Sequence, residues 1–389
     1  MKKPVSTEKL RLKLDKNLVF FVLVTLSMAA MVWFGLNSDI HYSPINMNGI
    51  SFVPGKVTQV VSETIETDQR GLKRGRQDLQ VELLSGARKG DVIDVVNYLS
   101  VDHNYYVKAG QGIIVYLDQQ PGETYYSATV QSYDRTWALC AAIVLFFVLL
   151  AVVSGKTGIR SAFGLLFTFV VVFGLLIPLI VRGAPPVPLA LGLVLCIVVV
   201  SLISILGFTK KTTASIVGTG LGIVICCLLF GIISYMLQIT GYNVSQVDAL
   251  VLIENNTDIR IGGFLFIGVL IASLGGVMDV SVSVASSVAE LKDTNPTLSF
   301  KSLFRSGVVI GRDVVGATLN TLIMAFTGSA FVSLILFRIY DYPLIMLINN
   351  DEIVIEVLQA LASSSALILC APITAFITAR VYTNTKKKL

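Results

Sequence analysis

Charged residues are scarce in this 389-residue chain, of which only 14% are Asp, Glu, Lys or Arg. A soluble domain carries about 25% charged residues, so the scarcity excludes an ordinary soluble protein. Histidine occurs only twice, at His41 and His103, which argues against a zinc site. All five cysteines lie in apolar runs and the polar segment 37–135 has none. We therefore expect no disulfide framework, no metal site and no bound cofactor.

Apolar residues are abundant instead: 54% of the chain is hydrophobic and its mean hydropathy is +0.76. Runs of about 20 apolar residues recur, each long enough to cross a hydrocarbon core of roughly 30 Å. The expected partner is therefore the lipid bilayer. The net charge of +5 needs no nucleic acid to explain it, because excess Lys and Arg are typical of the cytoplasmic side of a membrane protein.

The apolar runs predict eight membrane spans. Residues 1–16 hold six Lys or Arg and precede the first run, 18–36, which is long for a cleavable signal and is expected to be an uncleaved anchor. With the N-terminus inside, the segments assigned to the cytoplasm hold 17 basic residues and the short outer loops hold three. This asymmetry predicts that both termini are cytoplasmic. The seven further expected spans are 137–153, 161–181, 187–207, 215–239, 261–289, 307–337 and 354–382.

The segment 37–135 has a different character. Five short stretches alternate apolar and polar residues, and Gly- and Pro-containing turns separate them. This pattern predicts a small extracytoplasmic β-barrel-like domain, with an OB-like barrel as one form, between spans 1 and 2. The basic run Lys73-Arg74-Gly-Arg76 is expected to be a solvated loop between strands. The domains are therefore 1–36 (basic tail and first helix), 37–135 (β-rich) and 136–389 (a mainly α, seven-span helical domain with a basic cytoplasmic tail).

The sixth expected span contains one charge in an otherwise uncharged stretch. Between Ile261 and Ala289 the only charged residue is Asp279. A carboxylate at bilayer depth costs about 2.5–3.5 kcal/mol on insertion scales, so its retention indicates a use. On a helix, the side chains of Asp279, Ser283, Ser286 and Glu290 fall within an arc of roughly 60°. This stripe is our candidate substrate or ion pathway.

The seventh expected span carries a second polar stripe. Asp313, Gly316, Asn320 and Thr327 share a helical arc of roughly 60°, and Arg312 points about 100° away. Asp313 and Asp279 are expected at similar depth in the inner half of the membrane, which makes a polar cluster of Asp279, Arg312, Asp313 and Asn320 plausible. Two interpretations remain open. The cluster lines a pathway, or Arg312 and Asp313 form a structural pair that joins helices.

No catalytic motif accompanies these residues, and we expect no enzyme. Ser154-Gly155-Lys156-Thr157 resembles the end of a phosphate-binding loop, but the glycine that this motif requires is Leu150. Asp279 and Asp313 lack the flanking residues of intramembrane aspartyl proteases. Of the acidic residues at the outer end of the last span, only Glu356 could turn inward.

Two long stretches resemble the central signature of the YibE/F family of multi-pass membrane proteins. They are Gly275-Gly-Val-Met-Asp279 with the serines and Glu290 that follow, and Gly311-Arg312-Asp313-Val-Val-Gly316 with Asn320-Thr-Leu. Weaker matches extend the resemblance over roughly 137–380. The resemblance implies a helical bundle with an extracytoplasmic β-domain, and it implies no settled activity.

Two functions remain open. The first is a permease or secondary transporter of the cell membrane for an unknown small solute or ion, with Asp279 as the proton or cation site. The second is an envelope assembly or sensing protein, whose extracytoplasmic domain binds an envelope protein partner.

Overall fold

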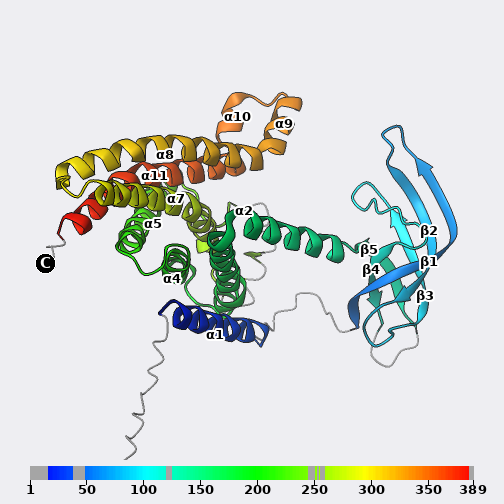
Figure 1. Ribbon diagram of the computed structural model, residues 1–389. Helices are drawn as coiled ribbons and strands as arrows, with labels where there is room; N and C mark the ends of the chain where they lie inside the picture. Colours follow the sequence, from blue (N-terminus) through cyan, green and yellow to red (C-terminus); the bar gives the residue numbers. More distant parts are fainter. Residues whose placement is uncertain are drawn as a thin grey trace, which may run out of the picture. The chain divides into compact units, whose positions relative to one another are not determined.

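The computed structural model describes residues 16–37, 49–119, 125–243, 250–251, 254 and 259–384. The chain divides into two compact units (Figure 1). One comprises residues 43–152, and the other comprises residues 1–42 together with residues 153–389. The first unit therefore contains the β-rich segment and also the start of the next helix.

The β-rich unit is a closed barrel of five strands in the order β1-β2-β3-β5-β4. The predicted number of strands is confirmed, although β1 is 18 residues long and not short. Inward-facing side chains such as Val57, Val81 and Val115 alternate with outward ones, as the sequence pattern requires. Strand β3 pairs with β5 in parallel, and the other neighbours are antiparallel. The strands are β1 (Ile50–Thr67), β2 (Lys73–Leu83), β3 (Val92–Leu99), β4 (Gly112–Asp118) and β5 (Ser127–Tyr133).

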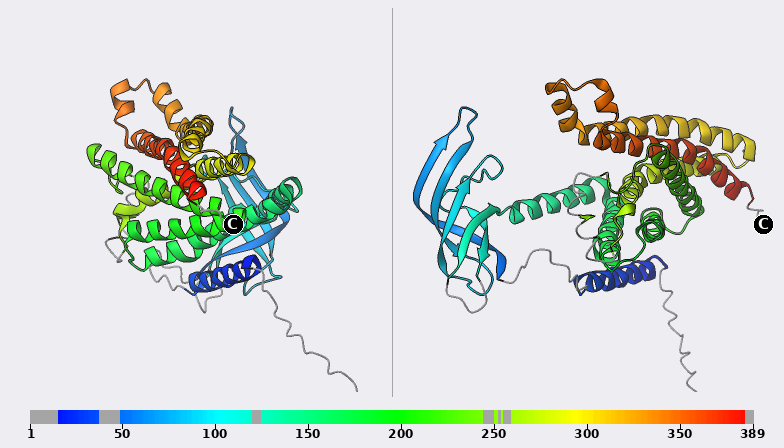
Figure 2. Two further views of the ribbon diagram at one scale, coloured as in Figure 1. Left: turned by 60° about the vertical axis from the view of Figure 1, so that its left-hand side comes forward. Right: turned by 180° about the vertical axis from the view of Figure 1, so that it is seen from behind.

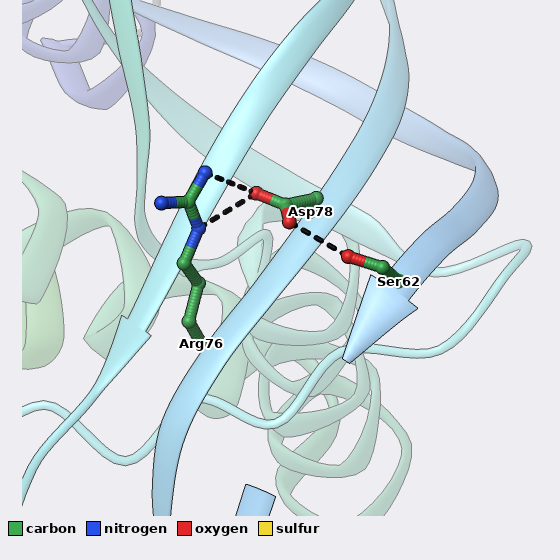
Figure 3. A network of polar contacts seen from close by, with 3 residues as sticks. All are labelled: Ser62, Arg76 and Asp78. Carbon is green, nitrogen blue, oxygen red and sulfur yellow. Dashed lines mark hydrogen bonds and ion pairs between the residues drawn. The ribbon is translucent and has the colours of Figure 1, made fainter. Parts of the chain in front are cut away.

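The basic run was wrongly expected to be a loop, because Lys73 is the first residue of β2. Arg76 lies beside Asp78, with 2.7 Å between Nη2 and Oδ1, and the Ser62 hydroxyl of β1 donates to Asp78 Oδ2 at 2.7 Å (Figure 3). The Ser62 bond and then Arg76 hold the pKa of the Asp78 carboxyl below its usual range. Their contribution to stability is therefore present above the pKa of the unfolded carboxyl and is lost as the pH falls through the lower folded pKa. Because the pair is on the surface, we expect this contribution to be small.

The second unit is helical. Within the described residues, seven helices are long and apolar enough to cross a membrane. Figure 2 shows α7, α8 and α11 side by side, as does Figure 1. The long helices are α1 (Lys16–Leu36), α2 (Thr136–Val171), α4 (Pro186–Leu206), α5 (Lys210–Met236), α7 (Phe264–Thr294), α8 (Phe300–Ser329) and α11 (Asp351–Thr383).

Two expected spans, 137–153 and 161–181, fall within one helical stretch of 46 residues, Thr136–Val181. This stretch comprises α2, a π-helical turn η1 (Val172–Leu176) and α3 (Ile177–Val181). The loop expected between the two spans is absent, and the only non-helical residue inside α2 is Gly155, with φ 55° and ψ −134°. Glycine adopts positive φ without steric cost, so the break needs a single residue. At 1.5 Å per residue the helical parts before and after the Gly155 kink are about 29 Å and about 39 Å long, each comparable to a hydrocarbon core.

The expected span 307–337 is also interrupted. Helix α8 ends at Ser329, and α9 (Phe331–Ile339) and α10 (Leu344–Ile348) lead into α11. The break therefore comes at Ala330, two residues after Gly328, which the sequence marked as a place to bend. The 30 residues of α8 span about 45 Å and can cross the membrane without α9.

Capping residues explain where α5, α8 and α11 begin. Gly207 ends α4 with a φ of 72°, and the Thr209 hydroxyl then accepts from the backbone N–H of Thr212 to start α5. Ser299 and Asn350 cap α8 and α11 in the same way. Such caps satisfy backbone donors that a helix start leaves free. The stretch from Gly207 to Thr209 is therefore a short capped turn between α4 and α5.

Candidate functional site

One face of α7 is made only of small and polar residues, and it points out of the bundle. Five residues are exposed along this face: Gly268, Ala272, Gly275, Asp279 and Glu290. Ser283 and Ser286 lie on the same line and are half-buried. The opposite face, which includes Val277, Val280 and Val284, is fully buried. The predicted stripe of Asp279, Ser283, Ser286 and Glu290 is therefore a continuous face of the helix with Asp279 near its centre.

The Asp279 carboxylate has no partner in the chain that the structure describes. No ion pair or hydrogen bond with a described residue involves it. A Cβ built on Gly275, one turn away, would meet no atom within 4 Å, and the same holds for Gly268. The stripe thus leaves open space beside an unneutralised carboxylate.

Helix α8 has a tightly packed inner face. Four buried residues follow one another on it at four-residue spacing: Leu303, Gly307, Gly311 and Val315. A Cβ on Gly311 would lie 3.0 Å from the Cβ of Ala371 in α11 and 3.3 Å from Val284 Cγ2 in α7. These glycines let the α8 backbone approach both neighbours, as small residues do between membrane helices.

The outer face of α8 carries the predicted polar residues. Arg312, Asp313, Asn320 and Thr327 are all exposed there, and Arg312 and Asp313 take part in none of the ion pairs among the described residues. Only the Thr327 hydroxyl has an intrahelical partner, the Ile323 carbonyl at 2.8 Å.

The structure does not bring Asp279 and Arg312 into contact. A Cβ on Gly276 would lie 3.6 Å from Thr318 Cγ2, and one on Gly311 would lie 3.3 Å from Val284 Cγ2. The helices α7 and α8 therefore run antiparallel, with Asp279 nearly level with Gly316. Asp279 and Asp313 are therefore offset by about 5 Å along the helix axes. The two carboxylates are thus nearly level along the helices, but the two polar stripes belong to separate helix faces, and their depth in a membrane stays a prediction.

A buried polar network joins α5, α7 and α11, and no sequence pattern predicted it. The Ser281 hydroxyl lies 3.0 Å from Thr374 Oγ1 and 3.0 Å from Cys370 Sγ. Cys370 Sγ in turn lies 3.6 Å from the Gly218 carbonyl oxygen. Because these residues come from distant parts of the chain, only tertiary structure reveals the network. Its complete burial indicates a role in helix packing.

A second feature that spacing alone could not reveal is an apolar pocket of about 290 Å³ between α8, α9 and α11. Phe326, Leu334 and Leu361 are among its lining residues, together with Glu356. The Oε2 atom of Glu356 is buried and has no hydrogen-bond partner among the described residues. The sequence had marked Glu356 as able to turn inward. The structure places one of its oxygens in apolar surroundings.

Replacing this carboxylate with an apolar side chain should stabilise the fold. An unsatisfied buried polar group costs about 1–3 kcal/mol, so we expect Glu356→Leu to raise the thermal midpoint of the purified protein. Glu352→Leu is the matched control, because Glu352 accepts a hydrogen bond from Ser333 at 2.8 Å and should lose stability or stay unchanged. A lower midpoint for Glu356→Leu than for Glu352→Leu in a detergent melting assay would contradict this.

The described residues contain no group of three or more His, Cys, Asp or Glu side chains that could hold a metal ion. No curated protein and no solved structure matches the chain. The family profile described as YibE/F-like protein matches residues 142–384, which takes in α7, α8 and α11 with both polar stripes. This range is more than half of the chain and confirms the resemblance that the two signatures indicated. The chain therefore belongs to the YibE/F-like family of proteins.

Proposed function

We propose that this protein is a permease or secondary transporter of the cell membrane and that the open face of α7 lines its path. The observation that carries the proposal is the unpartnered Asp279 at the centre of that face. A carboxylate inside a membrane span must be solvated or neutralised, and intramembrane ionisable residues commonly mark ion or substrate pathways. In this protein no described residue neutralises the Asp279 carboxylate. In a transporter, water and the transported ion or solute would solvate and neutralise it.

The residues of the stripe have distinct parts in this proposal. Asp279 binds the proton or cation, and Ser283 and Ser286 offer neutral hydroxyl ligands on the way to it. Glu290 stands at the cytoplasmic mouth, because the basic residues that follow belong to an inner segment. Gly268 and Gly275 keep the path wide, since neither carries a side chain and each has open space beside it. Arg312, Asp313 and Asn320 are not assigned to this path.

In this transporter the chain would cross the membrane eight times. The 46-residue stretch Thr136–Val181 is long enough to be two spans separated at Gly155, and with the six other long helices this makes eight. Both termini are then cytoplasmic, and the five-stranded barrel, which we take to be OB-like, is extracytoplasmic. Lys156 and Arg160 next to the break favour a cytoplasmic position for Gly155.

The alternative is an envelope assembly or sensing protein, and one observation on the barrel favours it. A pocket of about 370 Å³ between β3 and β5 is lined by Tyr98, Tyr125 and Asp94. Tyr98 and Tyr125 are exposed, and exposed aromatic side chains are enriched in protein interfaces. Under this alternative an envelope protein binds the barrel.

The experiment that tests the transport proposal is the substitution Asp279→Asn. It removes the charge and keeps the shape of the side chain. If the protein is a transporter that uses Asp279, the Asp279→Asn variant should lose transport activity while it still folds and inserts into the membrane. A purely structural carboxylate would instead change the amount of folded protein.

A further inference from the structure

We infer that two copies of this chain pair in the membrane through the outer face of α8. The inference does not depend on the transport proposal, because it concerns another helix and other residues. It starts from the exposed charges. If Arg305 marks the cytoplasmic boundary, Asp313 lies about 12 Å and Asn320 about 22 Å into the membrane. Exposure to lipid at that depth would cost about 2.5–3.5 kcal/mol for Asp313 alone, so a partner must cover the face.

The outer face has the spacing of a two-stranded coiled coil. Six exposed residues follow one another at alternating intervals of four and three, which is the heptad pattern. The a positions are then Asp313, Asn320 and Thr327, and the d positions are Val309, Gly316 and Ile323. The residues opposite this seam, such as Gly311 and Thr318, face α7 and α11 in the same chain. The seam is therefore open to a partner from Val309 to Asn320, whereas Ile323 and Thr327 also line the pocket between α8, α9 and α11.

The polar residues on the seam are self-complementary. Two copies inserted in the same orientation align their α8 helices in parallel about a two-fold axis. In such a pair an a residue contacts the g residue of the other helix, and Arg312 occupies g directly before Asp313. Each Asp313 therefore meets the Arg312 of the second copy, and the two ion pairs form reciprocally. A single Asn at an a position, such as Asn320, favours two strands in register.

Gly316 allows this close approach. A Cβ built there would meet no atom within 4 Å of the same chain, so the backbone is accessible between the polar layers. By contrast, the exposed charges on the α7 stripe, Asp279 and Glu290, are both acidic. Two copies facing each other through α7 would repel, whereas two copies facing through α8 neutralise each other. The charge pattern thus selects a second copy of this chain, and selects α8 as the face that binds it.

Charge reversal with charge exchange tests the pairing. The full-length protein in lipid vesicles, diluted stepwise with lipid, should be dimeric by single-molecule photobleaching. Arg312→Asp and Asp313→Arg should each weaken dimerisation at least about 30-fold, because each leaves like charges facing each other in the interface. The double substitution R312D/D313R exchanges the charges within each copy and should restore the dimer. Failure of the exchange to restore it, or a monomeric wild type at every dilution, overturns the inference.

Disulfide trapping tests the register without disturbing the charges. In a protein whose exposed Cys140 and Cys196 are replaced by Ser, Gly316→Cys at a d position should form an intermolecular disulfide under mild oxidation. Thr321→Cys is the matched control, because Thr321 is also exposed on α8 but lies at position b, away from the seam. Equal or preferential cross-linking through Thr321→Cys means that another face pairs, and it overturns the inference.

Discussion

Asp279→Asn is expected to reduce the activity of this protein by about 10- to 100-fold, the range that follows from losing an interaction with a charged group. The readout is rescue of a strain that lacks the chromosomal gene, with the protein level measured by immunoblot. The level and the thermal midpoint should stay equal to wild type or rise, because no described partner loses a bond and a charge leaves the apolar span. Loss of activity at a normal level is the signature of a pathway carboxylate.

Asp293→Asn is the matched control for this experiment. Asp293 is an exposed carboxylate on the same helix, beyond the end of the stripe, and its neutralisation should leave activity intact. Full activity of Asp279→Asn would refute the assignment of Asp279 to a path. A fall in protein level that accounts for the lost activity would favour the alternative. In that case Tyr98→Ala and Tyr125→Ala on the barrel should reduce rescue at a normal protein level.

Gly218→Val is expected to destabilise the helical unit by about 3 kcal/mol or more, since overpacking a tight core costs 1–3 kcal/mol and this site also breaks a polar contact. A Cβ on Gly218 would overlap Thr374 Oγ1 and would lie 3.1 Å from Ser281 Oγ. Those two hydroxyls bond each other at 3.0 Å inside the fully buried network. The new side chain therefore cannot be accommodated by rotation of one neighbour.

Gly231→Val on the same helix supplies the comparison. A Cβ at Gly231 meets nothing within 4 Å, so this substitution changes helix propensity and nothing else. Thermal melting in detergent should show a clearly lower midpoint for Gly218→Val and a nearly unchanged one for Gly231→Val. Equal midpoints for the two variants would mean that α5, α7 and α11 do not pack as closely as described.

Periodicity predicted the elements of this fold well, because it records which side chains are buried. Alternation in 37–135 predicted five strands, and the spacing of Asp279, Ser283 and Ser286 correctly placed them on one face of a helix. Helix boundaries that depend on a single residue were harder to predict from the sequence. A kink at the single residue Gly155 replaced an expected loop between two helices, since a polar Ser-Gly-Lys-Thr sequence is compatible with both.

The sequence could not predict which way each face points. Helical angles group Asp313 with Asn320, but they do not say whether that group meets Asp279 or turns outward. The inner face of α8 is instead fixed by Gly307 and Gly311, whose lack of a side chain admits α7 and α11. Likewise, Ser281, Cys370 and Thr374 carry no periodic signal, because single small polar residues are common in membrane helices.

A path along α7 requires that water reach the stripe around Asp279, and thiol labelling measures that access directly. Ser283→Cys, in the protein with Cys140 and Cys196 replaced by Ser, should react with a charged, membrane-impermeant methanethiosulfonate. Phe376→Cys on α11 is the matched control, because Phe376 is exposed among apolar side chains and lies nearly level with Ser283, two residues beyond the Ser281–Thr374 contact of 3.0 Å. A thiol ionises to its reactive form in water, so we predict that Ser283→Cys reacts at least about tenfold faster than Phe376→Cys. Equal rates at the two positions would contradict a hydrated path along α7.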